Sequence, residues 1–214
     1  MQTGKIEIDG IDIKHVRLDV LRERCFIAVS QDPLLLSNET LRFNLNPDAS
    51  VSDEIVTDAL RKTGLWSHFF IGERHLGEET GHAIDISELG QHAVFDKKLL
   101  LFQELSVGQC QLFALCRALI KAISLRCTGA KPVLLLDEVT SSLDSDTESI
   151  IHRVIDEEFT GNGHTVIIVA HRLSVLNEHT KTGRDAVAFM GDGRLLEVIT
   201  DLQPSTLRLL GEDE

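Results

Sequence analysis

Two adjacent carboxylates, Asp137 and Glu138, directly follow the apolar run Val133 to Leu136. An unbroken aliphatic run of this length predicts a strand covered on both faces, as in a parallel sheet between helices. Ligands of open α/β sheets lie beyond the carboxyl ends of the strands, where these carboxylates are expected. One carboxylate could hold Mg²⁺, and the next could act as general base on a water. The plainer alternative is a buried strand that ends in an acidic turn.

A second candidate site is the start of a helix predicted to follow Leu105. Ser106 and Gln109 have the S-x-x-Q spacing of a capping box, and apolar residues then recur at the spacing of an amphipathic helix. Gly108 would let another group approach the backbone closely. A capped helix N-terminus with free amides suits an anion, although an ordinary N-cap accounts for the same residues.

A third candidate is His171, which ends a second apolar run from Thr165 to Ala170. A helix is predicted between the two strands, with a capping box at Ser145 and Glu148. A right-handed strand–helix–strand crossover makes the strands parallel, so His171 is expected on the same rim of the sheet as the two carboxylates. By itself, a histidine at a strand end is more often structural than catalytic.

The other elements are predicted from period-2 alternation for hairpins and from caps and helical spacing for helices. They are, in chain order, a hairpin at residues 5–13, a short helix at 18–24, a strand at 26–29, a helix that starts at a capping-box-like Ser50 and ends at Gly64, a helical subdomain with loops over 66–103, and a hairpin at 185–198.

The composition of the chain excludes several classes of function. The 214 residues suffice for one α/β domain or for one domain with a small insert, and 43% of them are apolar. The four cysteines show no C-x-x-C pair, which suits a reducing compartment. The net charge of −13 argues against a nucleic acid partner, because phosphate neutralisation needs clustered Lys and Arg. No apolar run approaches the length needed to cross a bilayer.

In order along the chain, a set of motifs resembles the ATP-binding cassette (ABC) ATPases, most closely the second nucleotide-binding domain of multidrug-resistance-associated exporters. The motifs are Val29-Ser-Gln-Asp-Pro33, Leu105-Ser-Val-Gly-Gln109, Val133-Leu-Leu-Leu-Asp-Glu138, Ser142-Leu-Asp144 and Val169-Ala-His-Arg-Leu173. The resemblance covers nearly the whole chain. It implies an α/β fold, namely a P-loop NTPase-like ABC ATPase sheet with a helical subdomain, truncated at its N-terminus.

The resemblance also implies a domain outline. Residues 1–30 would form a partial antiparallel β and ATP-core element, and residues 31–104 the Q-loop and helical subdomain. Residues 105–200 would form the signature helix with the Walker B, D-loop and H-loop core, and residues 201–214 a C-terminal tail.

Each matched residue takes a role from the resemblance, with ATP and Mg²⁺ as the implied ligands. Gln31 would touch Mg²⁺ or the attacking water, Asp137 would support Mg²⁺, and Glu138 would be the general base. The signature, which reaches the γ-phosphate of ATP on a partner domain, would consist of Ser106, Val107, Gly108 and Gln109. Asp144 would lie at the interface between two cassettes, and His171 would contact the γ-phosphate.

The chain departs from the family pattern at one main point. No G-x-x-x-x-G-K-[ST] sequence occurs, although in the family this Walker A loop supplies a backbone cradle, a phosphate-binding Lys and a hydroxyl for Mg²⁺. The chain is expected to begin after the position of that loop, so tight ATP binding by these residues alone is not expected. Val107 also replaces the commoner glycine of the signature, and Cys110 stands where a basic residue is usual.

The leading expectation is therefore an ATP-hydrolysing segment of an ABC exporter, on the cytoplasmic face of a membrane. Its partners would be a second ATP-binding cassette and a transmembrane domain. The alternative is a non-hydrolysing module that offers its signature to another cassette. A soluble ABC relative that works on chromosomes or ribosomes is disfavoured by the acidic charge and by the absence of a long coiled-coil insertion between Gln31 and Ser106.

Overall fold

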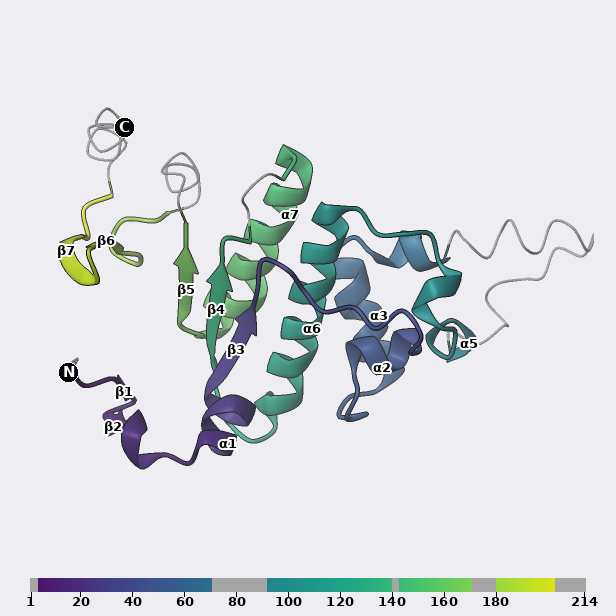
Figure 1. Cartoon of the computed structure of the whole chain (residues 1–214), viewed down its shortest axis with the longest axis horizontal. Helices are drawn as coiled ribbons and strands as arrows, with labels where there is room; N and C mark the ends of the chain where they lie inside the picture. The colour runs from purple at the N-terminus through teal and green to yellow at the C-terminus, as the bar shows by residue number, and fades with distance from the viewer. Residues whose placement is uncertain (1–3, 71–91, 140–142, 171–179, 203–214) are drawn as a thin grey trace, which may run out of the picture. The chain divides into compact units, whose positions relative to one another are not determined.

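The computed structural model describes residues 4–70, 92–139, 143–170 and 180–202 (Figure 1). The chain forms two compact units, Met1–Val169 and Ala170–Glu214. The elements of the first unit are, in chain order, β1 (Glu7–Ile8), β2 (Ile11–Asp12), η1 (Ile13–His15), α1 (Leu18–Val20), η2 (Leu21–Cys25), β3 (Phe26–Val29), α2 (Leu41–Leu45), α3 (Asp53–Lys62), α5 (His92–Phe95), η4 (Leu99–Leu101), α6 (Val107–Arg126), β4 (Val133–Asp137), α7 (Ser145–Val154), η5 (Ile155–Phe159), η6 (Thr160–Asn162) and β5 (Val166–Val169).

A three-stranded parallel sheet in the order β3–β4–β5 lies at the centre of the first unit. In its register Leu135 of β4 pairs with Ala28 of β3 and with Ile167 of β5. The helix α7 connects β4 to β5, and Figure 1 shows α6 and α7 alongside the sheet. The predicted parallel strand–helix–strand unit is confirmed.

The two faces of this sheet differ in burial. Leu134 and Leu136 of β4 are buried, together with Ile27 of β3, and they join one apolar core with α3, α6 and α7. The alternate side chains point to the other face, where Ala28 is exposed and Ile167 is 49% exposed. On this face Leu135 of the central strand β4 is half-buried. The predicted cover of the central strand is therefore confirmed for one face, against which the helices of the described ranges pack.

The helix α6 is buried on most of its circumference. Leu115, Leu119 and Ala122 lie on one side of the helix with exposures of 0%, and Phe113, opposite Ala122, is also 0% exposed. A helix that is apolar nearly all round is a core helix rather than a surface helix. The predicted one-faced amphipathic character is corrected accordingly.

Two helix starts differ from the prediction. Ser52, not Ser50, is the N-cap of α3, and the Ser50 amide and hydroxyl instead donate to Asn46 Oδ1, each at 3.0 Å. Asp144, not Ser145, is the N-cap of α7. In both places several short polar residues adjoin, and any of them can accept from the first turn of a helix. The predicted end of α3 at Gly64 is confirmed, with a left-handed φ of 73°.

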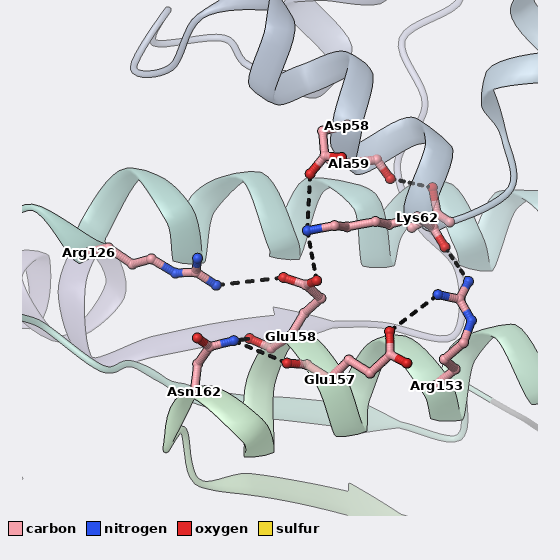
Figure 2. Close-up of polar contacts among 9 residues, drawn as sticks. Asp58, Ala59, Lys62, Arg126, Arg153, Glu157, Glu158 and Asn162 are labelled. Atoms are coloured by element: carbon pink, nitrogen blue, oxygen red, sulfur yellow. Dashed lines mark hydrogen bonds and ion pairs between the residues drawn. The ribbon is translucent and has the colours of Figure 1, made fainter.

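Charged side chains tie α3 to the end of the α7–η5 segment (Figure 2). Lys62 Nζ lies 2.7 Å from Glu158 Oε1 and 3.0 Å from Asp58 Oδ2. Arg126 of α6 approaches the same Glu158 carboxylate at 3.7 Å, and Arg153 Nη2 donates to the Lys62 carbonyl at 2.7 Å. Three elements distant in sequence thus share one ionic network.

The second unit contains the predicted hairpin, formed by β6 (Val187–Gly191) and β7 (Arg194–Ile199) in antiparallel pairing. Asp192 and Gly193 make its turn with positive φ values of 50° and 71°, as two-residue hairpin turns require. Within the described ranges of both units, no helix has the length and apolarity that a membrane crossing needs.

Candidate functional site

The carboxyl ends of the three parallel strands form one edge of the sheet. Val29 pairs with Leu136 and Asp137 pairs with Val169, so the strands end at nearly the same level. Gln31 follows β3, Asp137 is the last residue of β4, and Glu138 comes next. Asp137 and Glu138 are at the carboxyl end of β4, as predicted, and Gln31 lies beside them at the end of β3. His171, which was predicted on the same rim, lies outside the described residues.

Glu138 has a strained main chain. Its φ of 51° is in the left-handed region, which costs a residue with a side chain about 1–2 kcal/mol. Two neighbours hold it there: the Glu138 amide donates to the Val169 carbonyl at 3.1 Å, and the next residue, Val139, is 2% exposed. Strain of this kind is concentrated at functional sites, and here it turns the chain directly after the exposed Asp137.

The start of α6 contains the predicted capping box. Ser106 Oγ accepts from the Gln109 amide at 3.2 Å, and Gln109 Oε1 accepts from the Ser106 amide at 2.9 Å. The amides of Val107 and Gly108 have no partner within a helix, because they belong to its first turn. The side chain of Val107 is 71% exposed beside them. These two amides are therefore the groups that this helix start can offer to an anion.

The Gln109 amide group is fixed at its other end by His68. Gln109 Nε2 lies 3.4 Å from His68 Nδ1, and His68 Nε2 lies 2.9 Å from the Gln103 carbonyl. A carbonyl only accepts, so the proton is on Nε2 and the Nδ1 atom accepts from Gln109. This contact could not be predicted from the sequence, because only the fold brings residues 68 and 109 together.

Gly108 brings the α6 start against the α7 start. A Cβ atom at position 108 would lie 3.2 Å from Thr147 Cγ2 and 3.6 Å from Leu143 Cδ2. Asp144, between these two residues, accepts from the Thr147 amide at 2.9 Å and from the Thr147 hydroxyl at 2.7 Å. The hydrogen bond from the Thr147 amide, followed by that from its hydroxyl, lowers the pKa of Asp144. The predicted signature and D-loop residues are therefore neighbours within this chain.

A hydrogen bond joins the sheet edge to α6: Gln111 Nε2 donates to the Gln31 carbonyl. Arg117, two turns further along the helix, donates to the Leu34 carbonyl at 2.5 Å. The sequence-based expectations did not include these contacts. A signal was present for Gln111, since a polar residue four positions before Leu115 lies on the apolar side of the helix.

The predicted magnesium ligands, Asp137 and Gln31, both lie in the described part of the chain. Among the described residues, no group of three His, Cys, Asp or Glu side chains could hold a metal ion. Magnesium commonly takes only one or two protein carboxylates and completes its shell with waters and substrate phosphates. An exposed Asp137 at a sheet edge fits a cation that arrives together with a phosphate ligand.

No protein-family model matches the chain, but individual proteins do. ABC multidrug transporter B of Aspergillus fumigatus is 34% identical over 197 residues, which are 92% of this chain and 11% of that protein. Human ATP-binding cassette sub-family C member 2 is 36% identical over 194 residues, which are 91% of this chain and 10% of that protein. The chain thus spans about a tenth of the length of these relatives.

A solved structure agrees with these relatives. A bacterial Atm1-family ABC exporter with ATP bound matches 99% of this chain and 30% of its own chain, with a TM-score of 0.66 and 28% identity. The fold is therefore that of part of an ABC exporter. The chain is homologous to the ABC transporters, including members of their C subfamily.

Proposed function

We propose that the chain is the ATP-binding and ATP-hydrolysing part of an ABC exporter. The observation that carries this proposal is the shared edge of the parallel sheet, where Asp137 and Glu138 follow β4 and Gln31 follows β3. The similarity to exporters over most of the chain supports the same assignment.

The residues at the sheet edge would divide the chemistry. Asp137 would hold Mg²⁺, which when bound neutralises negative charge on the phosphates. Glu138 would accept the proton of the attacking water, and its fixed main chain limits where its carboxylate can reach. Gln31 would orient that water or the cation. His171 would contact the γ-phosphate, as the family resemblance implies.

The α6 start would act on a nucleotide held by a second cassette. The Val107 and Gly108 amides, with the Ser106 and Gln109 that frame them, would receive its γ-phosphate at the positive end of the helix. Asp144 would lie at the same interface, since Gly108 packs against the α7 start. A transmembrane domain would be the other partner, and the cassettes would lie on the cytoplasmic face of the membrane.

The phosphate cradle has to come from outside these residues. The 214 residues contain no G-x-x-x-x-G-K-[ST] loop, so hydrolysis is assigned to the polypeptide or complex that supplies one. Transport would be driven by that assembly.

The test is Glu138→Gln in the polypeptide that carries these residues in its source cells. Loss of a general base should lower ATP turnover at least about 100-fold, while ATP-driven pairing of cassettes persists. The matched control is Glu39→Gln, at an exposed position before α2, which should keep full turnover. Equal turnover in the Glu138→Gln protein would remove Glu138 from its role.

A second candidate function is a non-hydrolysing module that lends its signature to another cassette. It is favoured by the complete capping box at Ser106 and Gln109, which forms without any Walker A loop. This function predicts ATP-dependent association of the purified chain with an intact cassette, with no turnover attributable to Glu138. Turnover that depends on Glu138 would exclude it.

A further inference from the structure

Residues 31–36, here called the post-β3 loop, are held by side chains from two helices. Gln111 of α6 donates to the Gln31 carbonyl, and Arg117 of α6 donates to the Leu34 carbonyl at 2.5 Å. The Leu36 amide donates to Asn44 Oδ1 of α2 at 2.9 Å. The loop is thus fixed at its beginning, middle and end by side chains that it does not itself contribute.

The half-buried Arg117 and the buried Asn44 form one network behind this loop. Arg117 Nε donates to the Asn44 carbonyl, and Arg117 Nη2 donates to Asn44 Oδ1 at 3.2 Å. Asn44 is 2% exposed, and its Nδ2 donates to the Leu36 carbonyl at 2.9 Å. Burial lowers the pKa of Arg117, but a guanidinium stays charged in proteins, so its bonds to carbonyls are charge-assisted.

Gln111 contributes a more isolated contact. Its side chain is 3% exposed, and its Oε1 has no hydrogen-bond partner among the residues that the structure describes. Its Nε2 bond to the exposed Gln31 is therefore what orients the amide. Gln111 lies four residues after Val107, so it stands one helical turn beyond the signature start.

We infer that Gln111 and Arg117 are positioning residues for Gln31. One rigid helix carries the signature in its first turn and holds the post-β3 loop from its second and third turns. A displacement of the α6 start therefore displaces the main chain of Gln31 and Leu34 as well. The consequence of this linkage for ATP chemistry rests on the function proposed above, whereas the anchoring of the loop does not.

The experiment measures backbone order by ¹⁵N relaxation on the full 214-residue chain without nucleotide. In the wild type, the loop amides should have order parameters near about 0.85, as in rigid backbone. Gln111→Leu should lower the values at Gln31 and its neighbours, and Arg117→Met should lower those from Leu34 to Leu36, in each case below about 0.6. Gln111→Leu should not destabilise the fold strongly, for two reasons. It removes Gln111 Oε1, a buried acceptor without a partner among the described residues, and water can donate a hydrogen bond to the exposed Gln31 carbonyl in place of Gln111.

The matched control is Lys121→Met. Lys121 also lies on α6 and also donates to a carbonyl, that of Arg22 at 3.1 Å. Lys121 and Arg117 line the same cleft of about 210 Å³, but Lys121 bonds Arg22, which is not part of the post-β3 loop. This variant should leave the order parameters of the post-β3 loop unchanged.

Unchanged loop order in folded Gln111→Leu and Arg117→Met proteins would overturn the inference. If Arg117→Met does not fold, Arg117→Lys can replace it, because lysine keeps the positive charge but lacks the planar guanidinium with its several donors. This variant should lower the order parameters from Leu34 to Leu36 by a smaller amount. Fast hydrogen exchange of the Leu36 amide in the wild type would also overturn it. All these measurements omit nucleotide, so they are independent of whether the proposed ATPase function holds.

Discussion

The main chain of Glu138 has a conformation that a residue with a side chain disfavours. Replacing Glu138 by Gly or by Ala removes the same carboxylate, but only Gly adopts a φ of 51° without strain. Glu138→Gly should therefore unfold at higher urea than Glu138→Ala, by about 1 kcal/mol in the free energy of unfolding.

The control for this prediction is Ser149, which is exposed in the middle of α7. There Ala should be more stable than Gly by about 1 kcal/mol, the opposite order, because the backbone is right-handed. If Gly and Ala are equally stable at position 138, its main chain is not strained as described.

Single residues of the candidate site differ in how far the sequence predicts their structure. The capping box of Ser106 and Gln109 was predictable because it depends on residues three apart. The N-cap of α7 was predicted at Ser145 rather than Asp144, because adjacent short polar residues compete for the same role. The left-handed Glu138 was not predictable, since its conformation is imposed by a strand that is distant in sequence.

Between elements, the predicted site residue Gly108 in α6 lies against Thr147 in α7. Gly108→Ala should lower the free energy of unfolding by about 1 kcal/mol, because the new methyl group meets Thr147 Cγ2 at 3.2 Å. Adding Thr147→Ser removes that methyl group but keeps the hydroxyl that bonds Asp144, so the double variant should regain stability. Thr147→Ser alone is the control, and a Gly108→Ala cost that persists unchanged in the double variant would contradict the contact.

The ionic network of Figure 2 gives a second prediction between elements. A double-mutant cycle of Lys62→Met and Glu158→Gln should show a coupling of about 1 kcal/mol, since Glu158 is only 13% exposed. The more exposed pair Arg153 and Glu157 should show less than about 0.5 kcal/mol. A coupling no larger for Lys62 and Glu158 than for this control pair would contradict the role of the network.

The same network predicts a pH dependence. Burial opposes the charge on Lys62, but the hydrogen bonds to Glu158 and Asp58 outweigh it and raise the pKa of Lys62. A raised folded-state pKa gives stabilisation that is fully present below the unfolded value of about 10.4 and is lost as the pH rises through the higher folded value. The Lys62→Met protein should therefore lose less stability than the wild type above about pH 10.4.

The strands and hairpins were easier to predict from the sequence than the packing around them. Strands β3, β4 and β5 and both hairpins follow from apolar runs and alternation in the sequence. The burial of α6 on most sides and the open second face of the sheet do not, because they depend on which elements pack around them. The contacts of Gln111 and Arg117 with the post-β3 loop belong to the same class.

For the whole molecule, the order of the motifs predicted an ABC exporter fold, and the relatives and the solved exporter agree with it. Composition and charge alone predicted only a globular α/β protein without nucleic acid partners. The roles of Gln31, Glu138 and His171 stay predictions, because each depends on a nucleotide and a second cassette.

The proposal that this chain works as one cassette of an ATP-dependent pair can be tested directly at Val107. Val107→Asp should leave α6 stable, because the side chain is exposed and an acidic residue suits a helix N-terminus. The new carboxylate should nevertheless repel the phosphates of a nucleotide held by the partner. Val107→Asn is the neutral control of the same shape.

The measurement is the affinity of the chain for an intact cassette that carries a Walker A loop, with and without Mg²⁺ and ATP. We expect ATP-dependent association for the wild type and for Val107→Asn. The affinity of Val107→Asp should be weaker by at least about 10-fold, which corresponds to about 1.4 kcal/mol. The proposal would be contradicted if the wild-type affinity were the same with and without ATP, or if the Asp and Asn variants had equal affinities.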